Sequence, residues 1–241
     1  MRDPTAVTNH QLLDPQEHGQ LRLLPRVGVE PHFVQIVPSE FVAAAIACPI
    51  LFSKDPATGA FYAGAVLGLK PGEGALKSVE ERGGFEPLVL QRDGFLTSGE
   101  RIAIDRASPR FSEAEGELLF DETQRPSMCL RRVQRALGQL HEGIEQTGVL
   151  VRDLMHLKLL EPIDVGLSFD DGERLKLEGL YTVSRDSLRE LEDVHVLRLF
   201  RSGHLQLAYT IAGSVNQLAI LASLRNRKLA EVETSFGSRN R

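Results

Sequence analysis

The side chains that could do chemistry are concentrated in residues 104–121. This stretch holds five carboxylates, two arginines and two serines, and its candidate binding residues are Asp105, Ser108, Arg110, Glu113, Glu115 and Glu117. Carboxylate oxygens are the ligands that Mg²⁺ and Ca²⁺ prefer, and guanidinium groups bind anionic groups through paired hydrogen bonds. The stretch therefore indicates either a surface for a partner or ligand, or an enzyme site at residues 105–121 assisted by a divalent metal.

A purely structural role explains the same residue types. Ser108 precedes a proline, which is favoured at the first position of a helix, and Ser112 lies three residues before Glu115, the spacing of a capping box. Acidic side chains are stabilised near the positive end of a helix dipole. The pattern predicts a helix start, and it leaves open whether the acids converge on a site or only cap that helix.

The rest of the chain carries no catalytic or cofactor motif that can be recognised from spacing. Its seven histidines lack the spacing of a zinc or iron site, and its glycines lack Walker or dinucleotide spacing, so the cofactor is unknown. Cys48 and Cys129 lie beside apolar residues and are predicted to be buried free thiols. The formal net charge of −5, without clustered Lys and Arg, predicts no nucleic-acid surface.

Hydrophobic patterning predicts an α+β fold, with an antiparallel sheet with hairpins in the first half packed against a helix-rich second half. Strands are expected over residues 33–37, 50–53, 61–69, 84–91 and 102–104, with a short helix over 40–47. A long apolar seam from Val133 to Leu154 predicts a helix, with a break near Gly148 because glycine disfavours helix. A hairpin over 165–183 turns at Asp171–Gly172. A capping box at 187–190 opens a helix to residue 202, and a final helix covers 205–226.

Residues 205–224 carry no charge and are long enough to span a membrane. Small and polar side chains nevertheless recur there at helical spacing, at Gln206, Thr210, Gly213, Ser214 and Gln217. This stripe predicts a buried helix whose small face packs closely on a neighbour, and no transmembrane segment. The domain prediction is a flexible arm over 1–20, a single domain over 21–228 and a polar tail over 229–241. The first residues lack an apolar signal region, which predicts a cytoplasmic location.

Several ordered pieces of the chain resemble the SapC family. They include Pro-Ser-Glu-Phe at 38–41 with Pro-Ile-Leu-Phe at 49–52, Ile-Asp-x-x-Ser-Pro-Arg at 104–110 and Glu-Gly-Glu-x-Leu-Phe-Asp at 115–121. Leu-Glu-Pro at 160–162, Gly-Leu-Tyr-Thr-Val at 179–183 and Gly-His-Leu-Gln-Leu-Ala-Tyr at 203–209 follow in the same order. The resemblance covers about residues 20–228.

The resemblance supplies no catalytic residues, and the dense polar stretch at 104–121 without a catalytic constellation predicts a partner or ligand surface formed by this stretch and the last helices. Relatives occur beside genes for flavin-dependent halogenase-like proteins, cupin-like oxygenases and TonB-dependent receptors, and the family name derives from an association with bacterial surface layers. We therefore expect a non-enzymatic accessory protein with a protein partner, and leave homo-oligomer formation open. The alternatives are the acid-rich enzyme site at 105–121 and a surface-layer-associated component.

Overall fold

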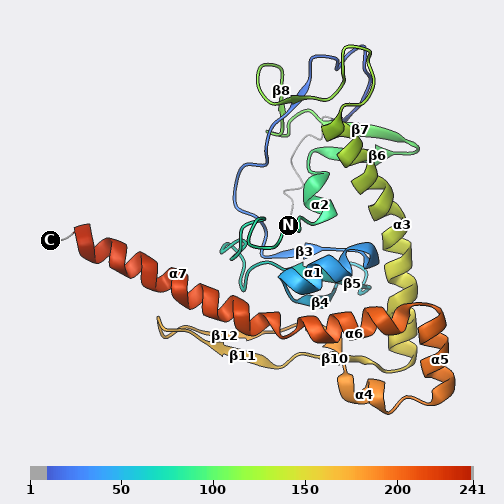
Figure 1. Ribbon diagram of the computed structural model, residues 1–241, viewed down its shortest axis with the longest axis vertical. Coiled ribbons are helices and arrows are strands. Elements are labelled where there is room, and N and C mark those ends of the chain that lie inside the picture. The colour runs from blue at the N-terminus through green and yellow to red at the C-terminus, as the bar shows by residue number, and fades with distance from the viewer. Residues whose placement is uncertain (1–9, 240–241) are drawn as a thin grey trace. The chain divides into compact units, whose positions relative to one another are not determined.

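The contacts within the computed structural model divide the chain into two compact units (Figure 1). The structure describes residues 10–239, with side chains as far as residue 231. Unit 1 consists of Met1–Gly28 and Leu88–Glu142, and unit 2 consists of Val29–Pro87 and Gly143–Arg241. Each unit thus combines two pieces of chain that are distant in sequence, and each has its own hydrophobic core. The single domain over residues 21–228 stays a prediction.

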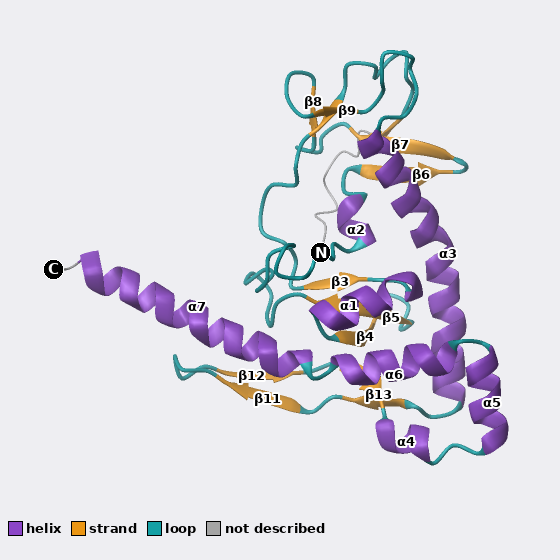
Figure 2. Cartoon of the chain, in the orientation of Figure 1, coloured by secondary structure: helices purple, strands orange, loops and turns teal. Residues whose placement is uncertain are grey.

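Two small antiparallel sheets form unit 1, in which loops are long (Figure 2). The first sheet has the order β1–β7–β6, and the second has the order β8–β2–β9. The strands are β1 (His10–Leu12), β2 (Arg22–Leu23), β6 (Phe95–Ser98), β7 (Arg101–Asp105), β8 (Phe111–Ser112) and β9 (Glu117–Leu118), and the short helix α2 (Leu88–Gln91) precedes β6. Residues 10–12, assigned to the arm from the sequence, pair with β7.

The core of unit 1 joins the first sheet to the first turns of the long helix α3 (Met128–His156). Phe95 and Ile104 are paired across β6 and β7, and both are fully buried. Leu119 and Leu130 belong to the same cluster. Burying such side chains stabilises a fold by about 1.5–3 kcal/mol each, so this cluster fixes the hairpin against the helix.

Unit 2 is built on a five-stranded antiparallel sheet with the order β10–β13–β4–β5–β3. Its strands are β3 (Phe33–Gln35), β4 (Ile50–Lys54), β5 (Phe61–Val66), β10 (Leu160–Pro162) and β13 (Leu180–Val183). The 3₁₀ turn η1 (Pro38–Glu40) leads into α1 (Phe41–Ala47), and α1 packs on β4 and on α6 (His204–Ser214). The hydroxyl of Ser214 accepts a hydrogen bond from the Ile50 amide at 2.8 Å, which ties α6 to the sheet.

The remaining elements of unit 2 surround a second apolar cluster. They are the hairpin β11 (Val165–Ser168) and β12 (Arg174–Leu177), and the helices α4 (Arg185–Arg189), α5 (Asp193–Arg201) and α7 (Gln217–Arg239). Phe169 and Leu177 of the hairpin pack with Leu218 and Leu221 of α7. In Figure 1 the last turns of α7 continue beyond this hairpin.

The predicted α+β class is confirmed, and three local predictions are wrong. Residues 84–91 form no strand, because Leu88–Gln91 coil into α2 and bury Leu88 and Leu90. Helix α3 runs through Gly148 without a break, since Leu150 and Leu154 are fully buried and this packing outweighs the cost of the glycine. The predicted capping box at 187–190 is wrong, because the serine that caps α4 is Ser184, whose hydroxyl accepts from the Ser187 amide. The single helix expected as far as residue 202 is divided into α4 and α5.

The uncharged stretch over 205–224 is divided between α6 and α7. The face that packs is apolar, through Ala208, Ile211 and Ala212, with Ser214 as its buried polar member. Gln206 is exposed, and a side chain added at Gly213 would meet nothing within 4 Å, so the predicted close packing of the small stripe is wrong. By length and composition, His204–Glu231 is the one helical stretch in the described part of the chain that could cross a membrane, which is weak evidence because core helices share these properties.

Candidate functional site

Ile104 and Asp105 end β7, and the residues that follow as far as 121 fold as turns and two short strands. The predicted helix start is therefore wrong. Strands β8 and β9 both pair with β2. The Ser112 hydroxyl accepts hydrogen bonds from the amides of Ala114 and Glu115, both at 3.1 Å. Gly116 has a φ of 102°, and a side chain there would lie 2.5 Å from the Leu23 carbonyl oxygen. Serine side chains that bond nearby amides offer the backbone an alternative to helix, and pairing with β2 selects that alternative.

Three of the predicted site residues are held by their own segment or by the neighbouring strand. The Asp105 carboxylate accepts from the Ala107 amide at 3.1 Å. The Ser108 hydroxyl accepts from the Arg110 amide at 3.3 Å. Arg110 is buried, and its Nε donates to the Leu24 carbonyl at 2.8 Å. These contacts give each group a structural role in unit 1.

The three glutamates of the prediction are exposed. Glu113 forms an ion pair with Arg106 at 3.2 Å, and Glu115 and Glu117 lie on the surface. At the end of the stretch, hydrogen bonds from the Thr123 hydroxyl and the Arg125 amide lower the pKa of Asp121 below its ordinary value. Over the described residues, no three His, Cys, Asp or Glu side chains are grouped so that they could hold a metal ion. The roles predicted for Asp105–Glu117 in partner binding or catalysis stay predictions.

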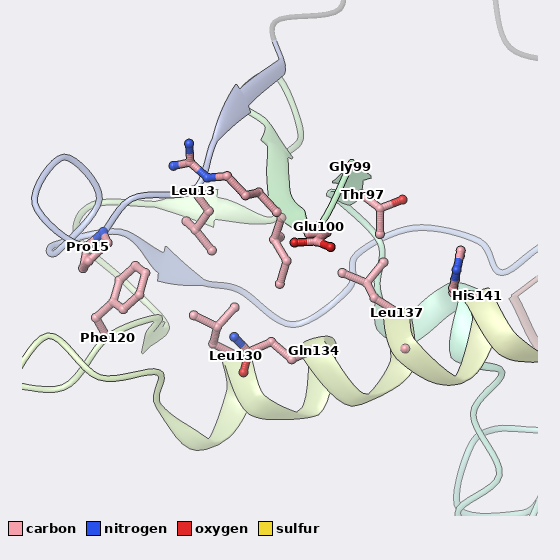
Figure 3. A pocket seen from close by; sticks show the side chains of 13 residues that line it. Leu13, Pro15, Thr97, Gly99, Glu100, Phe120, Leu130, Gln134, Leu137 and His141 are labelled. Atoms are coloured by element: carbon pink, nitrogen blue, oxygen red, sulfur yellow. The ribbon is translucent and has the colours of Figure 1, made fainter.

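A cavity of about 670 Å³ lies elsewhere in unit 1, between hairpin β6–β7 and the first turns of α3 (Figure 3). Its lining residues are Leu13, Pro15, Thr97, Gly99, Glu100, Arg101, Ile102, Phe120, Leu130, Gln134, Leu137, Gly138 and His141. Pockets that bind ligands are commonly about 300–1,000 Å³, mostly apolar, with a few polar groups that fix orientation. The volume and the mixed lining fit that description.

The sheet contributes one wall of the cavity through the tip of the hairpin. Thr97 and Ile102 face each other across β6 and β7, two residue pairs beyond the buried pair of Phe95 and Ile104. Side chains two residues apart on a strand share a face, so Thr97 and Ile102 continue the core face outward. The cavity is therefore the outer, unfilled end of the layer between sheet and helix.

Helix α3 contributes the opposite wall through one face. Leu130, Gln134, Leu137, Gly138 and His141 follow the spacing of that face. Leu130 and Leu137 are buried, whereas Gln134 and His141 are exposed. An apolar floor with a polar rim results, which suits an amphipathic guest.

Gly138 leaves a position on the helix side of the cavity without a side chain. A Cβ built on Gly138 would meet no heavy atom within 4 Å, so packing does not require glycine there. Gly143 differs, because its Cβ would lie 2.5 Å from the Cβ of Val37. Glycine inside a helix costs about 1 kcal/mol relative to alanine. Within the described residues, no close contact requires glycine at position 138. The missing side chain leaves room for a guest to approach the helix backbone.

Sequence reasoning missed this cavity. Gly138 is visible in the sequence, but only as a residue that weakens a helix. The available signal was its place in the seam, because Leu130, Leu137 and Gly138 share one helical face. Recognising a cavity also requires knowing that β6 and β7 lie opposite that face, which no local pattern states.

Unit 2 holds an ion-pair cluster around the buried side chain of Arg225. The side chain of Arg225 is 3% exposed and pairs with Glu73 and, at 2.6 Å, with Glu173. Its guanidinium lies over the ring of Phe169, 3.9 Å from the centroid. Hydrogen bonds from Lys70 and Arg225 lower the pKa of Glu173. The contacts tie α7 to hairpin β11–β12, which is a structural role.

A second cluster in unit 2 joins α3 to α5 and α6. The two oxygens of Asp153 bind Arg198 and His204 Nδ1, both at 2.7 Å. A carboxylate that orients a histidine occurs in catalytic triads, but a nucleophile within reach of the histidine would also be needed. The hydrogen bonds of His204 connect it with Asp153 and Ser202, which supports a tie between helices.

Comparison with known proteins identifies a family and no individual relative. The SapC family model matches residues 13–221 of the chain. This range includes the cavity of unit 1 from Leu13 onward and the clusters around Asp153 and His204. No curated protein and no solved structure matches the chain.

Proposed function

The chain belongs to the SapC family, and from this premise we propose that it is a non-enzymatic binding protein that receives a segment of a partner protein in the cavity of unit 1. The observation that supports the proposal is the open helix wall at Gly138 above an apolar floor. A glycine inside a helix destabilises the fold, and where packing does not require it, contact with a bound partner is a functional reason for it.

The floor offers anchoring for apolar side chains of the partner. Phe120, Leu130 and Leu137 are each at most 8% exposed, so they form a fixed surface rather than a mobile one. Interfaces draw most of their binding free energy from a few buried anchors, which lie in pockets surrounded by polar contacts. Burying one large apolar side chain here would contribute about 1.5–3 kcal/mol. The polar rim at Gln134 and His141 would then set the register of the segment.

The first partners to test are those that the family resemblance implies. These are flavin-dependent halogenase-like proteins and cupin-like oxygenases, encountered in the cytoplasm. A second copy of the chain is a further arm of the same experiment, because a homo-oligomer would also supply a segment to the cavity. An extended segment from any of these proteins could bind in the cavity.

The proposal is tested by selecting peptides from a random library against the full-length protein. The variant Gly138→Leu places a branched side chain in the cavity, and Gly148→Leu makes the same change on α3 where the added Cβ would meet only Arg152, at 3.5 Å. We expect enriched peptides to bind the wild type and Gly148→Leu alike, and to lose most of their affinity for Gly138→Leu. Peptides that bind all three proteins equally would overturn the assignment, provided that circular dichroism shows that the variants are folded.

A further inference from the structure

Strand β6 is an edge strand, and its outer edge lies beside the cavity. In the sheet order β1–β7–β6, the described residues place no strand on the far side of β6. Thr97 and Ser98 are exposed at the end of this strand. An open edge presents main-chain donors and acceptors, and an extended peptide can pair with them as an additional strand.

The register shows which main-chain groups of β6 are free to pair. The Asp105 amide donates to the Gly94 carbonyl at 2.9 Å, so Gly94 and Asp105 form a hydrogen-bonded pair. Such pairs alternate along an antiparallel ladder, which makes Thr97 and Ile102 a non-hydrogen-bonded pair. The Ile102 carbonyl confirms this, because it accepts from the Leu13 amide on the other side of β7. The amide and carbonyl of Thr97 therefore point outward, away from β7. Those of Phe95 also point outward, but the amide donates to the Arg92 carbonyl at 2.8 Å and the carbonyl accepts from Arg92 Nη1 at 3.1 Å, so Thr97 is the residue of β6 that offers both groups.

The side chain of Thr97 lines the cavity while its main chain faces the open edge. A segment paired with Thr97 would place every second side chain on the cavity face of the sheet. One of these side chains would enter the space between β6 and α3, beside Leu137 and Gly138, where Figure 3 shows Thr97 and Leu137 facing each other. The free edge and the cavity thus serve one extended guest.

The charge around the cavity favours an acidic guest. Arg101 and one carboxylate, Glu100, line it, so the excess of positive charge comes from the helix beside it. Arg131 and Arg135 are exposed on α3 in the two turns before Gly138, and the nearest acidic side chain of the helix, Glu142, lies after His141. A segment with apolar side chains in the cavity and acidic residues at its ends would complement this rim.

We propose that the partner segment binds in extended form, paired with Thr97 at the open end of β6, with alternate apolar side chains in the cavity and acidic residues toward Arg131 and Arg135. This inference rests on the proposed function, since it specifies how the same cavity is used. Strand addition takes its affinity from main-chain hydrogen bonds, and the cavity supplies the selection of side chains.

The test compares Thr97→Pro with Thr97→Ala in the full-length protein. Proline removes the outward amide of Thr97 without removing a hydrogen bond of the β6–β7 ladder, and such positions on edge strands tolerate proline. Alanine changes the side chain and keeps the amide. The probe is the most enriched peptide from the selection above, labelled with fluorescein, and binding is measured by fluorescence anisotropy.

We expect Thr97→Pro to weaken binding about tenfold or more, and Thr97→Ala to weaken it by less than about threefold. Methylating the peptide backbone one amide at a time should weaken binding at the position that pairs with the Thr97 carbonyl, and this readout does not depend on how the proline variant folds. Raised salt should weaken binding, because Arg131 and Arg135 are exposed.

Equal losses for the two Thr97 variants, or backbone methylation without effect at every position, would overturn strand addition. If Gly138→Leu still abolishes binding in that case, the cavity remains the binding site and only the mode of binding is wrong. If Gly138→Leu has no effect on the peptide, the proposed function fails as well. The two failures are therefore distinguishable.

Discussion

Replacing Gly138 with alanine is expected to stabilise the protein while it weakens binding in the cavity. The stabilisation follows from helix propensity, since glycine in a helix interior costs about 1 kcal/mol relative to alanine. The new methyl group meets no heavy atom within 4 Å, so no steric term opposes the gain. For a chain of this size, about 1 kcal/mol corresponds to a rise in Tm of about 2–4 °C.

Two matched glycines on the same helix make the measurement decisive. Gly148→Ala should raise the Tm similarly, because the nearest atom to its new Cβ is Arg152 Nη1, at 3.5 Å. Gly143→Ala should lower the Tm, because its Cβ would lie 2.5 Å from Val37, and overpacking of this kind costs about 1–3 kcal/mol. Thermal unfolding followed by circular dichroism gives all three values under the same conditions.

Peptide binding then separates the two stabilising variants. Gly138→Ala should weaken binding of the selected peptide severalfold, whereas Gly148→Ala should leave it unchanged. If Gly138→Ala lowers the Tm as Gly143→Ala does, the space beside Gly138 is occupied and the reasoning from an open helix wall is wrong. If Gly138→Ala stabilises the protein and binding is unaffected even by Gly138→Leu, the space is open and is not the binding site.

Three further predictions concern unit 2. Arg225→Met should lower the free energy of unfolding by about 2–3 kcal/mol in a urea titration, because Glu73 and Glu173 lose a buried cation. Adding Glu73→Gln should restore part of the loss. An unchanged free energy of unfolding in Arg225→Met would refute the structural role of the cluster. Burial lowers the pKa of His32 from 6.5, against an opposing effect of Glu73. The contribution of His32 to stability is therefore full above pH 6.5 and is lost as the pH falls toward the folded-state pKa. Between pH 7 and about pH 5.5, the free energy of unfolding of His32→Asn should fall less than that of the wild type. Burial raises the pKa of the Cys48 thiol to about 12, so iodoacetamide at neutral pH should modify Cys48 in urea and not in the folded protein, as mass spectrometry will show.

The sequence predicts the fold class because its strongest patterns are local and agree with the packing. The Asp171–Gly172 turn lies between β11 and β12, and Gly172 has the positive φ of 81° that such turns require. The long seam from Val133 to Leu154 is helix α3 throughout. In α3 the residues of the seam also face the core, and the exposed Asp171–Gly172 turn lies between Phe169 and Leu177, which are buried, so local and tertiary preferences coincide.

Residues 104–121 show how a tertiary contact overrides a local signal. Ser112 and Glu115 have the spacing of a capping box, but the deciding partner is β2, which lies far earlier in the chain. The Arg22 guanidinium donates to the Gly116 carbonyl at 3.0 Å, and Gly116 adopts a φ that favours glycine. The glycine was present in the sequence, but its reason, the backbone of Leu23 at 2.5 Å, is visible only after folding.

The three glycines of α3 explain why the cavity could not be predicted. In the sequence, Gly138, Gly143 and Gly148 are equivalent interruptions of one helical seam. The structure gives Gly143 a steric reason in Val37 and gives Gly138 none within the described residues. A glycine that folding does not need, on a helix face that lines a cavity, is the observation that links the stability of α3 to binding. Its physical consequence is that alanine at 138 should improve the fold and impair binding, a combination that a purely structural glycine would not produce.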